Sequence, residues 1–186
     1  MIVERAVESI SAGEVVGLPT DTVYGLGVDP RNRAAVAKLY ELKGRPDHRP
    51  VGLLVASIEQ AREIGVFDRV GEELMKTHWP GPLTLVVAPK VILADWVGDT
   101  QTRTVGLRVP DLAVTIELLS ETGPLAVTSA NLSGGPETMG DAEARALFGD
   151  QVAFYVDGKA PGGVSSTVVD LTGSRPVVLR EGPVRI

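Results

Sequence analysis

Residues 14–56, EVVGLPTDTVYGLGVDPRNRAAVAKLYELKGRPDHRPVGLLVA, contain the alternating pattern from which we predict the fold. The apolar run Glu14–Leu18 predicts a strand, and Thr22–Val28 predicts a second extended segment broken by glycines. Residues 32–43 place apolar side chains at helical spacing before a glycine, so they predict a helix. The apolar run Val51–Ala56 predicts a buried strand. Alternation of strands with helices is typical of α/β proteins.

The same alternation continues along the chain, and strands cluster near its end. We expect further helices at 3–12, 57–64, 68–78, 111–122 and 141–148. We expect further strands at 83–88, 104–109, 125–128, 152–156, 166–171 and 176–180. The predicted helix caps are Ser57, Asp68 and Asp111. Some connections are too short for parallel crossovers, so we predict a mixed sheet. We expect a single domain spanning residues 1–186.

The composition excludes several classes of protein. No cysteine occurs, which excludes disulfides, thiolate catalysis and cysteine-bound metals. The two histidines, His48 and His78, are too far apart in the chain to suggest a metal site. No apolar run approaches the roughly 20 residues needed to span a bilayer, and the first residues do not resemble a signal peptide. We therefore expect a cytoplasmic protein that does not contact a membrane.

Charge is distributed unevenly along the chain. The net charge is −6, yet residues 31–49 contain six of the 18 Lys and Arg residues and only two of the 24 Asp and Glu residues. A basic segment on an acidic protein suits a compact anionic ligand better than a long polyanion. A solvent-exposed basic helix face is the alternative interpretation.

Five polar clusters lie beside the predicted strands. They are PTDTVYGLG (19–27), KGRPDHRP (43–50), TRTVGLRVP (102–110), TSANLSGGP (128–136), and SSTVVD (165–170) with the later LREG (179–182). Common phosphate-loop, dinucleotide and nucleophile motifs are absent. An enzyme with this composition would act by positioning and by stabilising charge, as in transfer at phosphorus. Together the clusters suggest a pocket for a nucleotide and a small amino acid.

In this order, and with WPGPLTLV at 79–86, the clusters resemble the YrdC/TsaC family of threonylcarbamoyl-AMP synthases, in its short single-domain form. The likeness runs from about Gly13 to Gly182. It implies a twisted open mixed sheet flanked by helices, with a positively charged concave cavity. It also implies a nucleotidyltransferase that converts L-threonine, bicarbonate or CO₂, and ATP with Mg²⁺ into threonylcarbamoyl-AMP and pyrophosphate. A separate transferase would then use the product to modify tRNA.

The resemblance further implies roles for individual residues. The implied L-threonine contacts are Thr22, Arg108, Thr128 and Ser166. The implied ATP contacts are Lys43, Arg45, Arg49, Thr104, Ser129, Asn131 and Arg180. Lys43 and Arg45 are the predicted catalytic residues, which would stabilise the charge that develops when a carbamate oxygen attacks the α-phosphorus. No metal-ligating residue is predicted.

Two alternatives stay open at this point. The chain could be an RNA-binding module of the same fold, in which the basic segment 31–49 contacts phosphates. It could also be a paralogue that adenylates a different carbamoyl substrate, because Leu54 replaces a histidine that some members place near threonine.

Overall fold

The strands form one sheet, which is flanked by helices. The structure, a computed structural model, describes residues 2–44 and 50–186. The helices are α1 (Ile2–Ser11), α2 (Arg33–Leu42), α3 (Ile58–Ile64), α4 (Arg69–His78), α5 (Ala113–Thr122) and α6 (Asp141–Phe148). The strands are β1 (Val16–Leu18), β2 (Gly25–Val28), β3 (Gly52–Leu54), β4 (Leu83–Val87), β5 (Val105–Arg108), β6 (Leu125–Ser129), β7 (Phe154–Tyr155), β8 (Thr167–Asp170) and β9 (Val177–Arg180).

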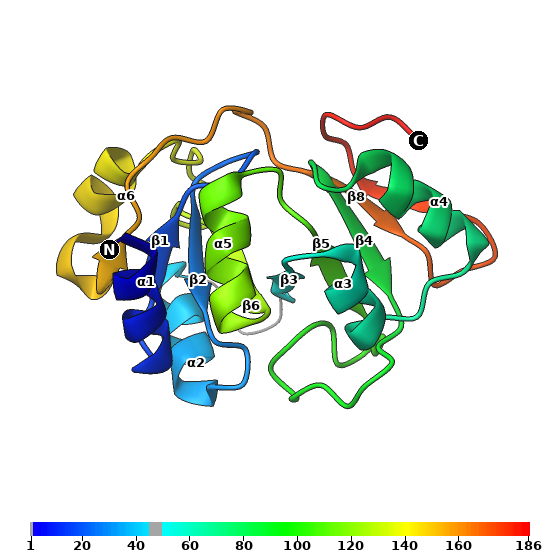
Figure 1. Ribbon diagram of the computed structural model, residues 1–186, viewed down its shortest axis with the longest axis horizontal. Coiled ribbons are helices and arrows are strands. Elements are labelled where there is room, and N and C mark those ends of the chain that lie inside the picture. Colours follow the sequence, from blue (N-terminus) through cyan, green and yellow to red (C-terminus); the bar gives the residue numbers. More distant parts are fainter. Residues whose placement is uncertain (1, 45–49) are drawn as a thin grey trace.

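The sheet is mixed, as predicted. Its strand order is β7-β1-β2-β6-β3-β5-β4-β8-β9. The pairs β1/β7, β3/β5 and β4/β8 are parallel, and the other neighbouring pairs are antiparallel. Figure 1 shows α1, α2 and α6 on the side of β1 and β2, α5 near the middle beside β6, and α3 and α4 on the side of β4 and β8. None of the helices within the described ranges has the length and apolar character needed to cross a membrane.

Two of the three predicted helix caps are confirmed. The Ser57 hydroxyl accepts a hydrogen bond from the Gln60 N–H, and the Asp68 carboxylate accepts one from the Gly71 N–H. The predicted cap at Asp111 is wrong. Helix α5 begins two residues later, at Ala113, so Leu112 occupies the N-cap position and supplies no side-chain hydrogen bond.

The predicted extended segment Thr22–Val28 is shorter in the structure. Only Gly25–Val28 pair as strand β2. Before them, the Thr20 hydroxyl accepts hydrogen bonds from the backbone N–H groups of Thr22 and Val23, which holds this part of the chain in a bend. The bend places a polar loop, rather than more strand, beside the centre of the molecule.

Alternation along the strands separates the core from the site. In β4, Leu83, Leu85 and Val87 are buried in the main apolar cluster. Burying such side chains contributes roughly 1.5–3 kcal/mol each, so this face anchors the strand. Thr84 and Val86 point to the opposite face, where they line a cavity.

Candidate functional site

A cavity of about 620 Å³ occupies one face of the sheet. Alternate residues of neighbouring strands form much of its wall. These include Thr84 and Val86 of β4, Gly106 and Arg108 of β5, and Val168 and Asp170 of β8. A volume in this range is typical of small-molecule sites.

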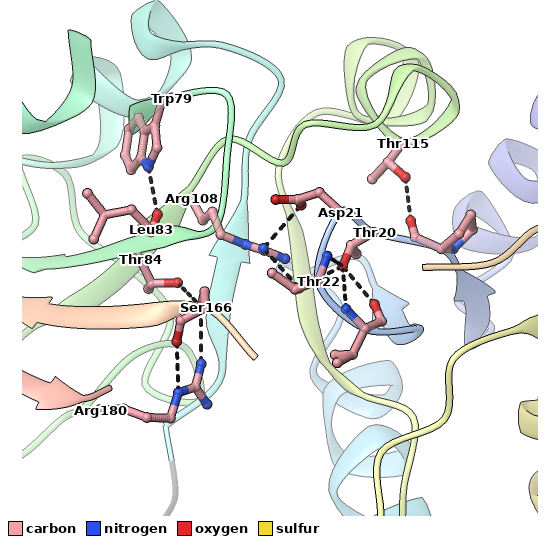
Figure 2. A network of polar contacts seen from close by, with 12 residues as sticks. Thr20, Asp21, Thr22, Trp79, Leu83, Thr84, Arg108, Thr115, Ser166 and Arg180 are labelled. Atoms are coloured by element: carbon pink, nitrogen blue, oxygen red, sulfur yellow. Dashed lines mark hydrogen bonds and ion pairs between the residues drawn. The ribbon is translucent and has the colours of Figure 1, made fainter. Parts of the chain in front are cut away.

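Arg108 is held at the wall of this cavity by the polar loop before β2. The side chain is buried, and its Nη1 donates to Asp21 Oδ1 (3.2 Å) and to Thr22 Oγ1 (3.0 Å). Figure 2 shows the guanidinium reaching across from β5 to this loop. Burial lowers the pKa of Arg108, and the carboxylate of Asp21 opposes that shift. The pair therefore keeps a buried cation beside the cavity.

The loop that holds Arg108 is itself backed by another part of the chain. The Gly163 N–H donates to the Thr22 carbonyl (2.8 Å). A Cβ atom on Gly162 would lie 2.4 Å from the Asp21 carbonyl oxygen, so only glycine allows this close approach. Segment 162–163 thus fixes the position of Asp21 and Thr22.

A second polar group, on the other side of the cavity, joins β4, β9 and the residue before β8. Arg180, at the end of β9, donates from Nε to the Ser166 carbonyl (3.0 Å) and from Nη2 to Ser166 Oγ (3.1 Å). Ser166 Oγ also lies 2.8 Å from Thr84 Oγ1. All three side chains are drawn in Figure 2, and all three residues line the cavity.

Lys43 lies behind the cavity wall. It is 1% exposed, and its Nζ donates to the Ser129 carbonyl (2.6 Å) and to Asn131 Oδ1 (2.5 Å). Asn131 in turn donates from Nδ2 to the Gly135 carbonyl (2.7 Å). The ammonium group therefore joins the end of β6 to the loop that follows it, and Ser129, the last residue of β6, lines the cavity.

Most of the site residues expected from the resemblance meet at this cavity. Those that line it are Thr22, Thr104, Arg108, Thr128, Ser129, Ser166 and Arg180. Lys43 and Asn131 contact Ser129 from behind. Arg45 and Arg49 lie outside the described residues. The roles of all these residues as ligand contacts stay predictions.

The charge of the cavity also stays a prediction. Within the described part of its lining, two arginines, Arg108 and Arg180, are matched in number by two aspartates, Asp99 and Asp170. The cations predicted at Arg45 and Arg49 lie outside the described residues.

Thr84 and Thr20 are among the residues of the site that were not predicted from the sequence. Thr84 is the one hydroxyl in the apolar strand LTLVV, and its alternation with buried leucines is the signal that could have placed it on the cavity face. Thr20 lies in the polar cluster 19–27, but its contacts depend on the bend and could not be read from spacing.

The fold and the site define an α/β protein with a ligand cavity on one face of a mixed sheet. The family model Sua5/YciO/YrdC, described as "Telomere recombination", matches residues 8–182. A protein of Mycobacterium tuberculosis is 47% identical over 181 residues, which are 96% of this chain and 83% of that protein. A threonylcarbamoyl-AMP synthase of Bacillus subtilis is 40% identical over 184 residues, which are 97% of this chain and 53% of that enzyme. The chain belongs to the Sua5/YciO/YrdC family.

A solved structure agrees with this assignment. The crystal structure of Pyrococcus abyssi Sua5 complexed with L-threonine superposes with a TM-score of 0.91 at 35% identity. The match covers 97% of this chain and 54% of that one, so this chain spans about half of the Pyrococcus protein. The predicted family and the α/β fold with a mixed sheet are confirmed.

Proposed function

We propose that this chain is a threonylcarbamoyl-AMP synthase, which acts in the cytoplasm and supplies an activated intermediate for tRNA modification. The observation that carries the proposal is the placement of Arg108 and Arg180 in one cavity with several hydroxyl groups, within a family whose Bacillus member has that name. A carboxylate and a polyphosphate are the anions for which guanidinium groups are suited.

The amino-acid half of the proposed reaction uses Arg108. Its Nη1 is occupied by Asp21 and Thr22, so the rest of the guanidinium is available for the carboxylate of L-threonine. Ser166 and Thr128, which line the same cavity, would contact the remainder of the amino acid. Held in this way, the deprotonated amine attacks CO₂, an N–C bond forms, and the nitrogen releases its extra proton to solvent.

The nucleotide half completes the proposed reaction. The carbamate oxygen attacks the α-phosphorus of ATP, an O–P bond forms, and pyrophosphate leaves with the electron pair of the broken P–O bond. Arg180 would contact the nucleotide directly, and Lys43 would act through Ser129 at the end of β6. Arg45 remains the proposed cation for the charge on the phosphates. Losing one such contact typically costs about 2–4 kcal/mol in the barrier.

Magnesium would enter with ATP rather than occupy a site made wholly by protein. In ranges 2–44 and 50–186, no group of three His, Cys, Asp or Glu side chains could hold a metal ion. Asp99 and Asp170 are the carboxylates in the described lining, and Mg²⁺ commonly takes one or two carboxylates with substrate phosphates. These two residues could therefore contact the ion, which would neutralise phosphate charge.

Pyrophosphate release tests the proposal. The protein would be incubated with ATP and bicarbonate, with and without L-threonine, and pyrophosphate would be measured. Release should require both threonine and bicarbonate. Equal release without threonine would contradict the proposal.

One observation favours a second candidate, a paralogue with a different amino-acid substrate. Leu54 lines the cavity, so an apolar side chain borders the ligand space. A panel of amino acids in the same assay would separate the two. Faster turnover of a more apolar amino acid than of threonine would favour the paralogue.

A further inference from the structure

The hydroxyl proton of Thr20 has a fixed direction. Thr20 Oγ1 lies 2.7 Å from the Val23 carbonyl oxygen, which can only accept, so Thr20 donates there. The same oxygen accepts from the N–H groups of Thr22 (3.2 Å) and Val23 (3.3 Å). Thr20 is 2% exposed and lines the cavity.

This direction determines the next two hydrogen bonds. Thr22 Oγ1 lies 2.9 Å from Thr20 Oγ1, and because the proton of Thr20 is already used, Thr22 is the donor in this pair. The two longer contacts from the backbone N–H groups share the remaining lone pair of Thr20. Arg108 can only donate, and its Nη1 reaches Thr22 Oγ1 at 3.0 Å. One directed chain therefore runs from Arg108 through Thr22 and Thr20 to the Val23 carbonyl. Arg108, Thr22 and Thr20 are labelled in Figure 2. Hydrogen bonds in such a chain strengthen one another.

Arg108 has donors that its contacts with Asp21 and Thr22 do not use, and the residue lines the cavity. The second Nη1 proton goes to Asp21 Oδ1, and within the described residues Nε and Nη2 donate to no other group. Asp21 Oδ2 is the one fully buried side-chain nitrogen or oxygen atom without a hydrogen-bond partner in the described part of the chain. Arg108 lines the cavity, and its Nε and Nη2 atoms form a planar fork that matches a carboxylate.

We propose that Thr20 is a positioning residue that orients Arg108 through Thr22 and thereby determines how tightly the cavity binds an amino-acid carboxylate. The inference rests on the proposed function, because that carboxylate belongs to L-threonine. Thr20 would contact neither the reacting atoms nor the nucleotide. Its effect would appear in threonine affinity and leave ATP affinity unchanged.

Two substitutions at Thr20 and two probes, L-threonine and ATP, test the proposal by calorimetry. Thr20→Val keeps the shape and removes the hydroxyl, and Thr20→Ser keeps the hydroxyl. Thr20→Val should weaken threonine binding about tenfold, the scale of a lost hydrogen bond that supports a charged group. Thr20→Ser should restore threonine binding to within about threefold, because the serine hydroxyl rebuilds the chain of hydrogen bonds. The ATP affinity of both variants should not change.

Thr115→Val is the matched control. The Thr115 hydroxyl is also buried and also anchors this loop, by donating to the Pro19 carbonyl, but it lies outside the chain that holds Arg108. Its loss should lower thermal stability without selectively weakening threonine binding. Thr22→Val, alone and combined with Thr20→Val, should give non-additive losses, because the two residues act in series.

The outcomes separate the two proposals. If the wild type binds threonine and Thr20→Val binds it equally well, the role of Thr20 is overturned and the proposed function stands. The role of Thr20 is also overturned, and the proposed function stands, if Thr20→Ser binds threonine as weakly as Thr20→Val. It is likewise overturned if Thr20→Val weakens threonine and ATP binding to the same extent. If the wild type does not bind threonine at all, both proposals fail.

Discussion

Arg108 is the residue on which the proposed chemistry depends most. A buried guanidinium is costly unless it is paired, and here Asp21 and Thr22 supply partners from a loop distant in sequence. The pairing uses one nitrogen, and the remaining part of the planar fork is left for a ligand. Its geometry is therefore as important as its charge.

We predict that Arg108→Lys will lose threonine use although it keeps the positive charge. Lysine has a compact ammonium group and cannot satisfy Asp21 and Thr22 while also forming a fork to a carboxylate. The KM for threonine should rise by about tenfold or more, with a smaller effect on the KM for ATP. Steady-state rates of pyrophosphate release measure both.

Arg69→Lys is the control for this prediction. Arg69 lies on the exposed surface of α4, where its side chain is 88% exposed and pairs only loosely with Glu73. The substitution should change neither KM. An Arg108→Lys enzyme with a normal KM for threonine would show that the fork is not needed.

At the scale of elements, the end of β9 is placed against β8 by one glycine. A Cβ atom on Gly182 would lie 2.3 Å from the Thr167 nitrogen and 2.6 Å from the Ser166 carbonyl carbon. We predict that Gly182→Ala will push this segment away and break the contacts between Arg180 and Ser166. Such overpacking should cost about 1–3 kcal/mol of stability and reduce turnover, as denaturant unfolding and rate measurements would detect.

Gly173→Ala provides the comparison, because Gly173 lies in the turn between β8 and β9 with its nearest neighbour at an ordinary 3.8 Å. It should be tolerated. If both alanine variants behave like the wild type, close packing at Gly182 does not position Arg180.

Helix α4 gives a prediction about stability alone. Asp68 accepts the Gly71 N–H at 2.8 Å and so satisfies one free donor at the helix start. Asp68→Ala should lower the free energy of unfolding by about 1 kcal/mol, and Asp68→Asn should nearly restore it, since asparagine caps equally well. Urea unfolding of the wild type and the two variants measures these free energies. An unchanged midpoint for Asp68→Ala would contradict the role of the cap.

Elements that depend on local patterns were predictable from the sequence, and those that depend on distant contacts were not. The caps at Ser57 and Asp68 could be identified from residue type and position. Burial of Lys43 could not, because the partners that accept its protons lie on a loop almost 90 residues away. The start of α5 was misplaced because Asp111 has the chemistry of a cap but lies one residue too early.

The site follows the same division. Polar clusters beside predicted strands indicated most of the residues that line the cavity, because strand ends bring such clusters together. The contact of Arg108 with Asp21 and Thr22 required the bend at Thr20 and the close packing of Gly162. Neither feature has a signature in spacing or composition.

At the scale of the whole molecule, Tyr24 couples stability to pH. Its hydroxyl donates to the Val156 carbonyl at 2.7 Å, and burial raises the pKa of Tyr24 above its ordinary value near 10. The folded state therefore keeps a proton that the unfolded state loses. The free energy of unfolding should fall as the pH rises past about 10, by up to roughly 1.4 kcal/mol per pH unit from this group.

Tyr24→Phe removes the titrating group, so its alkaline decline should be less steep. Urea unfolding of both proteins between about pH 8 and 11 measures the two slopes. The variant should be less stable at neutral pH, because the Val156 carbonyl loses its donor. Equal slopes would mean that Tyr24 does not contribute to alkaline unfolding.

The central claim is that one cavity joins an amino acid, a carbon from bicarbonate and a nucleotide. Mass spectrometry of the products formed from L-threonine, ATP and ¹³C-labelled bicarbonate tests it most directly. The account predicts threonylcarbamoyl-AMP that carries the heavy carbon, and its loss when any one substrate is omitted. A nucleotide product that contains no threonine, or no labelled carbon, would contradict it.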